Sequence, residues 1–156
     1  MKKIILTLAI AISSFSAALA GTSFGKPATA KGEEVSAKVL GVFSKEFTTA
    51  KDITWTVASN YYQASFMYND QYVSAYYSID GDLMGLTRYI SPADLPLALQ
   101  SDLKKNHSEY WVTDLFEVAN DNGTAYYITL EDADQKIVLK AAGGKNWENF
   151  KKVKKA

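Results

Sequence analysis

The sequence predicts an α+β protein made of two tandem helix-plus-four-strand units, with an antiparallel sheet, both helices on one face and an open concave face. Three observations support this fold class. Residues 53–90 alternate between side chains destined for two faces, as strands do, and residues 110–153 do so again. Each run follows a segment whose apolar residues recur at steps of three and four. Strands grouped after each helix favour an antiparallel sheet.

The first twenty residues are not expected to belong to the fold. Lys2 and Lys3 precede the apolar run 4–12, and small residues surround a cleavage site at Ala20. This pattern is typical of a secretory signal peptide, and the apolar run is about half the ~20 residues that a spanning helix needs. The sequence therefore predicts signal-peptide cleavage near Ala20 and a periplasmic or secreted protein that does not span the membrane.

The rest of the chain is expected to hold one domain. Residues 21–32 are small and polar, which predicts a flexible leader. Residues 33–156 are then one folded domain, with halves at about 33–91 and 92–156. The chain contains no cysteine, which suits a bacterial envelope protein better than a disulfide-stapled eukaryotic one. Its 17 basic and 17 acidic residues give no basic field, so nucleic acid is not an expected partner.

The first helix is predicted over residues 33–48. Its apolar stripe consists of Val35, Val39, Val42, Phe43 and Phe47. Glu33 and Glu34 suit the positive end of the helix dipole. The stripe must be buried, and the strands that follow provide the surface.

Four short strands are predicted within 53–57, 61–68, 72–79 and 83–90. Asn69-Asp70 is expected to form a turn between the second and third strands. Asp80-Gly81 is the strongest hairpin signal, and we expect a type I′ turn with positive φ at both residues.

The second helix is predicted to start at Ser91 and to end near Asn106. Ser91 is a favourable N-cap, and Asp94 can complete a capping box. Pro96 is expected within the first turns, where proline costs least. One face carries Leu95, Leu99 and Leu103.

Four more strands are predicted over 110–119, 124–130, 135–142 and 147–153. Strict alternation in the first of these places Val112, Phe116 and Val118 on one face. Trp111 and Leu115 then lie on the other face.

Several short motifs resemble the PepSY-like family of periplasmic proteins. They are Trp55, Tyr62-x-Ala64-x-Phe66, Ala75-Tyr76, Asp80-x-Asp82 around Gly81, Ile90 and Asp94-Leu95-Pro96. That family is also described as similar in fold to beta-lactamase inhibitor protein. The resemblance covers roughly residues 33–150. It implies a tandem fold with a concave sheet face and a non-catalytic exported domain that binds or inhibits another protein, with no catalytic residue to carry over. The second half departs from the pattern, because Ala125-Tyr126-Tyr127-Ile128 replaces the Tyr-x-Ala-x-Phe run.

The residues give little support to an enzyme. His107 is the only histidine, and without cysteine neither a thiolate nucleophile nor a His/Cys metal site is available. No G-x-S-x-G motif is present. We therefore predict no catalytic residue, no cofactor and no metal ligand, with His107 capping the second helix. An alternative function is a small-ligand or calcium-binding periplasmic protein that uses acidic turn residues, namely Asp80, Asp82, Glu131, Asp132 and Asp134.

The aromatic surface is the stronger functional signal. If Ala64, Phe66 and Ala75 face the helices, then the intervening side chains face outward. Tyrosine, tryptophan and arginine dominate binding hot spots, and Arg88 is the only arginine. The predicted binding residues are Tyr61, Gln63, Met67, Tyr72, Tyr76 and Arg88. The tyrosines alternatively only stiffen the sheet by cross-strand pairing. We expect a binding module, an inhibitor or a sensor, that binds a protein or peptide of the cell envelope.

Overall fold

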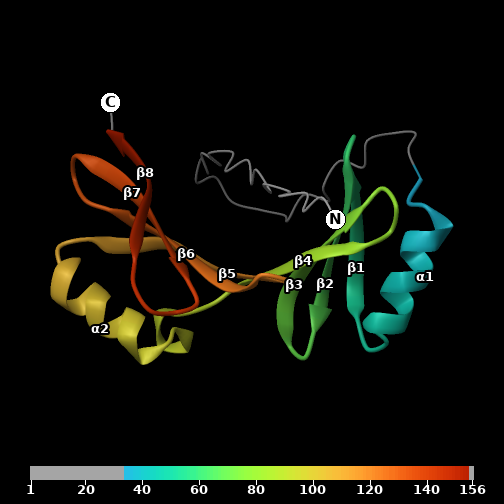
Figure 1. Cartoon of the computed structure of the whole chain (residues 1–156), viewed down its shortest axis with the longest axis horizontal. Coiled ribbons are helices and arrows are strands. Elements are labelled where there is room, and N and C mark those ends of the chain that lie inside the picture. Colours follow the sequence, from blue (N-terminus) through green and yellow to red (C-terminus); the bar gives the residue numbers. More distant parts are fainter. Residues whose placement is uncertain (1–33, 155–156) are drawn as a thin grey trace, which may run out of the picture.

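The computed structural model describes residues 34–154, which form one eight-stranded antiparallel sheet and two α-helices (Figure 1). The strands follow one another in chain order across the sheet, from β1 at one edge to β8 at the other. The predicted α+β class and element order are confirmed. The predicted signal peptide (1–20) and leader (21–32) lie outside the described residues.

The first half contains α1 and four strands, and the second half contains a 3₁₀ turn, α2 and four strands. In chain order the elements are α1 (Ala37–Glu46), β1 (Lys51–Val57), β2 (Tyr61–Tyr68), β3 (Gln71–Ser78), β4 (Leu83–Tyr89), η1 (Pro92–Asp94), α2 (Leu97–Asn106), β5 (Trp111–Asn120), β6 (Gly123–Glu131), β7 (Gln135–Ala142) and β8 (Glu148–Lys154). No helix in the described range 34–154 is long and apolar enough to cross a membrane.

Helix α1 is shorter than the predicted 33–48. Ser36 caps it, because its hydroxyl accepts a hydrogen bond from the Val39 N–H at 3.3 Å. The sequence prediction instead used the two glutamates as the start signal and overlooked this serine. The predicted stripe is nevertheless buried, with Val39 and Phe43 against the sheet.

The β2–β3 and β3–β4 hairpins have different turn geometries. Asn69 and Asp70 both have positive φ (49° and 60°), as a type I′ turn requires. In the next hairpin only Gly81 does, at 88°. There the Ser78 N–H donates to the Asp82 carbonyl across a three-residue loop, in which a single glycine supplies the left-handed position. The predicted type I′ turn at Asp80-Gly81 was therefore wrong.

The second helix is broken at Pro96, which the prediction had placed inside it. Residues 92–94 form a 3₁₀ turn, Leu95 is extended, and α2 begins only at Leu97. Proline disfavours the α conformation in the residue before it, so Leu95 cannot continue the helix. The predicted capping box is present, because the Ser91 N–H donates to the Asp94 carboxylate at 2.8 Å.

Two separate hydrophobic cores lie under the helices. The first is rich in aromatic residues and contains Val39, Phe43, Ala64, Phe66, Ala75 and Tyr77, with Trp55 and Phe47 packed against it. The second is aliphatic and contains Leu95, Leu99, Leu115, Ile128, Leu130, Ile137, Leu139 and Ala141.

Both cores lie on the same face of one continuous sheet. Strands β4 and β5 join the halves, and Leu86 pairs with Ala75 on one side and Ala119 on the other. Directly paired residues share a face, so the face that carries Ala75 in the first half continues to Leu115 in the second. In Figure 1 the sheet curves away from α1 and α2 and leaves a concave side opposite them. We call that side the open face.

Strand β5 departs from the predicted alternation. A bulge between Val112 and Asp114 inserts one extra residue, so the strand changes phase. Val112 pairs with the core residue Leu130, whereas Phe116 pairs with Tyr127 on the open face. The expectation that Val112, Phe116 and Val118 share a face was therefore wrong for Val112.

Candidate functional site

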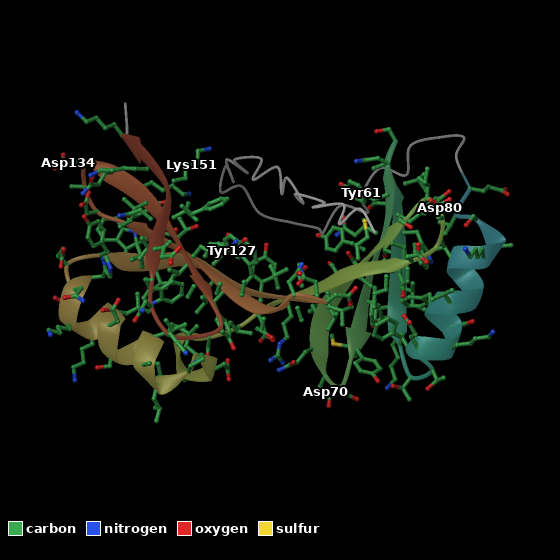
Figure 2. The ribbon with its side chains drawn as sticks, in the orientation of Figure 1. Tyr61, Asp70, Asp80, Tyr127, Asp134 and Lys151 are labelled. Carbon is green, nitrogen blue, oxygen red and sulfur yellow. The ribbon has the colours of Figure 1, made fainter. Side chains whose placement is uncertain are left out.

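The open face is the candidate functional site. In the first half it carries the side chains of Thr54, Thr56, Tyr61, Gln63, Ser65, Met67, Tyr72, Ser74, Tyr76, Thr87 and Tyr89. In the second half it carries those of Asp114, Phe116, Val118, Ala125, Tyr127, Thr129, Lys136, Val138, Lys140 and Lys151. Figure 2 shows the labelled Tyr61 and Tyr127 on this side of the ribbon.

Five of the six predicted binding residues lie together on this face. Gln63 pairs with Tyr76 and Met67 pairs with Tyr72 across β2 and β3, and Tyr61 pairs with Ser78. Tyr72 is 69% exposed, whereas Tyr76 is half-buried.

Tyr76 is held in place by its neighbours. Its ring lies 5.9 Å from that of Tyr61, measured between centroids. Burial raises the pKa of the Tyr76 phenol, and a side-chain hydrogen bond with Thr87 partly opposes that rise. Tyr76 therefore remains a neutral phenol at physiological pH and presents an uncharged aromatic surface.

A polar network occupies the centre of the first half's open face. The Ser65 and Ser74 hydroxyls lie 3.0 Å apart, and the Gln63 amide donates to both, at 3.2 and 3.3 Å. These side chains satisfy one another across β2 and β3, which fixes the orientation of Gln63 between the tyrosines.

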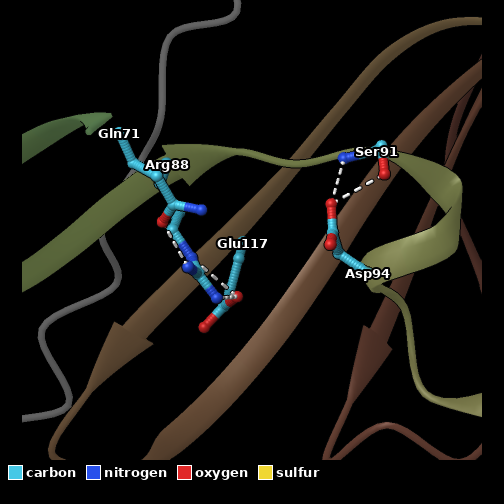
Figure 3. Close-up of polar contacts among 5 residues, drawn as sticks. All are labelled: Gln71, Arg88, Ser91, Asp94 and Glu117. Atoms are coloured by element: carbon cyan, nitrogen blue, oxygen red, sulfur yellow. Dashed lines mark hydrogen bonds and ion pairs between the residues drawn. The ribbon is translucent and has the colours of Figure 1, made fainter. Parts of the chain in front are cut away.

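Arg88 is not on the open face, which corrects its predicted placement. It pairs with Val73 and Glu117, on the side that the helices cover. Its guanidinium donates from Nε and Nη2 to one oxygen of Glu117, at 3.1 and 2.8 Å, and from Nη1 to Gln71 at 2.6 Å (Figure 3). The sequence prediction grouped Arg88 by residue type, without a register for β4. Its observed contacts tie β4 to β5.

A pocket of about 280 Å³ opens beside this ion pair, on the helix-covered face. Its apolar lining includes Phe47, Val73, Leu86 and Ala119, and Arg88, Glu117 and Gln71 supply polar groups. The pocket lies beside the seam between the halves, and Phe47, Val73 and Leu86 of its lining also pack against the first core.

A row of aromatic side chains crosses the second half of the open face, and the sequence analysis did not identify it. Ring centroids lie 6.3 Å apart for Tyr89 and Phe116, 5.2 Å for Phe116 and Tyr127, and 5.4 Å for Tyr127 and Phe150. Phe116 and Tyr127 are stacked, with an interplanar angle of 8°. We call these four residues the aromatic row.

Charged groups surround the aromatic row. The Lys140 ammonium lies 5.5 Å from the centroid of the Tyr127 ring, within cation–π range. Lys136 and Glu131 form an ion pair at 2.9 Å. Burial raises the pKa of the Asp114 carboxyl, and Lys136 partly opposes the rise. In the first half, Lys51 pairs with Met67 at the outer edge of this face, and the open-face positions from Thr54 to Tyr89 carry no charged side chain.

The acidic turn at Asp132 binds the backbone of its own loop. The Asp132 carboxylate accepts hydrogen bonds from the Asp134 and Gln135 N–H groups, both at 2.8 Å. Within residues 34–154, no three histidine, aspartate or glutamate side chains are grouped closely enough to hold a metal ion. His107 stands at the C-cap of α2, where its N–H donates to the Leu103 carbonyl at 2.9 Å.

Solved structures share this fold at low sequence identity. A BLIP-like protein from Bacteroides fragilis matches with a TM-score of 0.71 and 18% identity, over 81% of this chain and 92% of that one. A DUF2874 family protein from Bacteroides ovatus matches with a TM-score of 0.69 and 16% identity, over 79% and 89%. Another from Bacteroides uniformis gives 0.68 and 15%, over 78% and 90%.

No family model matches the sequence, and no curated protein does. At these identities the structural matches show the fold alone. The chain therefore has a BLIP-like fold, and its relation to the PepSY-like family stays a resemblance.

Proposed function

We propose that this chain is an exported, non-catalytic binding module that binds a protein or peptide of the cell envelope on its open face. As an inhibitor it would cover the partner, and as a sensor it would detect it. The observation that carries the proposal is the aromatic row, together with the tyrosines beside it.

The aromatic side chains are suited to binding because they are held in position and still reach solvent. Tyr89 is 74% exposed and Phe150 is 52% exposed, although both contact a ring of the aromatic row. Such rings lose little conformational entropy on binding, because their few rotatable bonds are already restrained. Aromatic side chains dominate binding hot spots for the same reason.

The two halves of the face suggest different roles. The first half, with Tyr61, Tyr76 and Gln63, offers uncharged hydroxyl and amide groups to a peptide backbone. The second half offers the aromatic row and the lysine at residue 140, which attract apolar and acidic side chains. A protein surface with an acidic rim around an apolar centre fits both.

Export is part of this proposal. It rests on the basic, apolar and small-residue pattern of residues 1–20, which is that of a signal peptide. The BLIP-like fold supports a binding function only by analogy.

The test is affinity capture from an envelope extract of the producing cells. The unchanged protein is compared with Tyr127→Ala/Phe150→Ala and with Leu97→Ala, which truncates an exposed apolar residue (81% exposed) on α2. We expect a protein that the unchanged chain and Leu97→Ala retain, and that the double variant loses. Equal retention by all three would contradict the open face as the binding site.

A small-ligand function is the second candidate, and the seam pocket is the observation that favours it. Apolar walls with a few convergent polar groups are the usual lining of small-molecule sites. Native mass spectrometry of protein purified from producing cells tests this candidate. A bound small molecule that is lost in Ala119→Leu, which fills the pocket, would support it. Calcium binding by the acidic turns predicts instead a melting temperature that rises with calcium and falls with chelator.

A further inference from the structure

The two edge strands of the sheet are protected very differently. Strand β8 carries Lys151, Lys152 and Lys154, all exposed. Lysines on an edge strand discourage pairing with another chain. Strand β1 is protected only at its start, by the exposed Lys51 and Asp52 and a bulge before Thr54, and it has no charged side chain between Ile53 and Val57. Among residues 34–154, β2 is the only strand that pairs with β1.

The backbone of β1 has hydrogen-bonding groups that face away from the sheet. The Ala58 N–H donates to the Tyr61 carbonyl, toward β2. In an antiparallel ladder successive residues point their N–H and C=O groups to opposite sides. Thr56 and Thr54 therefore bond to β2, and the backbone groups of Trp55 and Val57 point outward.

We propose that β1 is an interface at which a second copy of this chain pairs antiparallel, through a two-fold axis at Trp55. The segment Ile53-Thr54-Trp55-Thr56-Val57 is nearly symmetric about that residue. In this register Trp55 meets Trp55, Thr54 meets Thr56, and Ile53 meets Val57. The result is a continuous sheet through both copies.

The charges of β1 fit this register. Lys51 and Asp52 are exposed and precede the paired segment, because the bulge between Lys51 and Thr54 and the positive φ of Asp52 (54°) interrupt the regular strand there. No like charges meet, and no charged side chain is buried without a partner. Threonine pairs across strands are favourable, and here they lie on the open face. The same operation on β8 would bring its lysines together.

An apolar groove beside β1 accommodates the second copy. It has a volume of about 520 Å³ between α1 and β1, and its lining includes Leu40, Phe43, Phe47, Ile53 and Trp55. Leu40 and Ile53 are 43% and 44% exposed. Val57 of the second copy, opposite Ile53, covers this end of the groove. The short edge pairing buries less than a standard interface, so we expect a dissociation constant on the order of 10 µM.

Cysteine trapping tests the register directly, because the natural chain has no cysteine. Thr54 and Thr56 of the two copies form a non-hydrogen-bonded pair, with Cα atoms about 4.5 Å apart, within disulfide range. Thr54→Cys protein is mixed with Thr56→Cys protein under mild oxidation. We expect a disulfide-linked dimer in the mixture, and much less with either variant alone. Equal linkage in all three samples would overturn the register.

Charge variants test the association itself by sedimentation velocity. Thr54→Lys/Thr56→Lys places like charges opposite each other, and we expect the dimer to weaken by roughly tenfold or more. Thr54→Lys/Thr56→Glu places opposite charges together, and we expect the dimer to persist. Circular dichroism melts show that both variants fold. An unchanged protein that stays monomeric at all accessible concentrations would overturn the proposal.

Discussion

The two halves of the molecule share one order of helix and strands, but their hydrophobic cores are built from different residue types. The first core is a cluster of rings in which Phe66 lies 4.9 Å from Phe43 and 4.8 Å from Phe47, between centroids. The second core is made of leucine, isoleucine and alanine. Trp147 closes its side by donating to the Leu99 carbonyl at 3.2 Å. One architecture therefore tolerates two core compositions, provided that each helix buries one apolar stripe.

The open faces of the two halves also differ in composition, and each differs from the core beneath it. The first half, whose core is aromatic, presents tyrosines around a neutral hydroxyl and amide network. The second half, whose core is aliphatic, presents the aromatic row and several lysines. The two halves therefore offer unequal groups to the proposed partner, so variants in each half should affect binding differently.

The largest expected effect comes from Phe66→Ala in the first core. Phe66 is 1% exposed, and truncating such a ring costs about 3–5 kcal/mol. Because β4 and β5 are continuous, we expect both halves to unfold together. Trp55 reports on the first half and Trp147 on the second, so urea unfolding is followed in Trp→Phe backgrounds that retain one reporter. Different midpoints for the two reporters would show that the halves unfold independently.

A smaller effect is expected for Tyr77→Phe, which keeps the ring and removes one hydrogen bond. The Tyr77 hydroxyl donates to Glu46 of α1 at 3.2 Å, and its loss should cost about 1 kcal/mol. Equilibrium denaturation measures this difference. A neutral result would mean that the ring alone positions α1.

The same residue gives a pH dependence whose sign is fixed. Burial, and then the nearby Glu46 carboxylate, raise the pKa of the Tyr77 phenol far above its usual value. A raised folded-state pKa contributes stability that is present below the unfolded pKa of about 10 and is lost as pH rises above it. We expect the free energy of unfolding to fall above pH ~10, and less steeply in Tyr77→Phe. Equal slopes would contradict this.

Breaking the seam ion pair should cost less than either core change. Arg88 is 39% exposed at its side chain and Glu117 is 17% exposed, so solvent screens the pair. We expect Arg88→Gln to lower the free energy of unfolding by about 0.5–1 kcal/mol. Gln71→Ala, which removes only the neutral partner of Arg88, is the matched control. A loss well above that range would make the seam a major determinant of stability.

The smallest effect is expected on the open face itself. Tyr72 is 69% exposed, so Tyr72→Ala should change stability by less than about 0.5 kcal/mol. Tyr76→Ala should cost more, because its ring packs against Tyr61. Thermal melts of the two variants measure the difference. The reverse order would contradict the packing of Tyr76 against Tyr61.

The sequence allowed the class, the element order and the faces of β2 and β3 to be predicted, because regular alternation there maps directly onto burial. It failed where a local feature broke the period. The bulge near Thr113 places Val112 on the opposite face from Phe116. Pro96 shifts the start of α2 to Leu97. The register between neighbouring strands cannot be read from the sequence of one strand. The alignment of Tyr89, Phe116 and Tyr127 and the pairing of Arg88 with Glu117 were therefore not predictable. Allowing for a bulge in β5 would have corrected the face of Val112, and the tyrosines at 126–127 were the available signal for the aromatic row.

Site-specific photo-crosslinking in the producing cells identifies which surface of the protein contacts a partner. A photoreactive phenylalanine analogue replaces the half-buried Tyr127 on the open face, or the exposed Leu97 on α2 as the control position. The binding-module account predicts a covalent adduct with an envelope protein from position 127 and none from position 97. Adducts from position 97 alone, or from neither position, would contradict the open face as the binding surface.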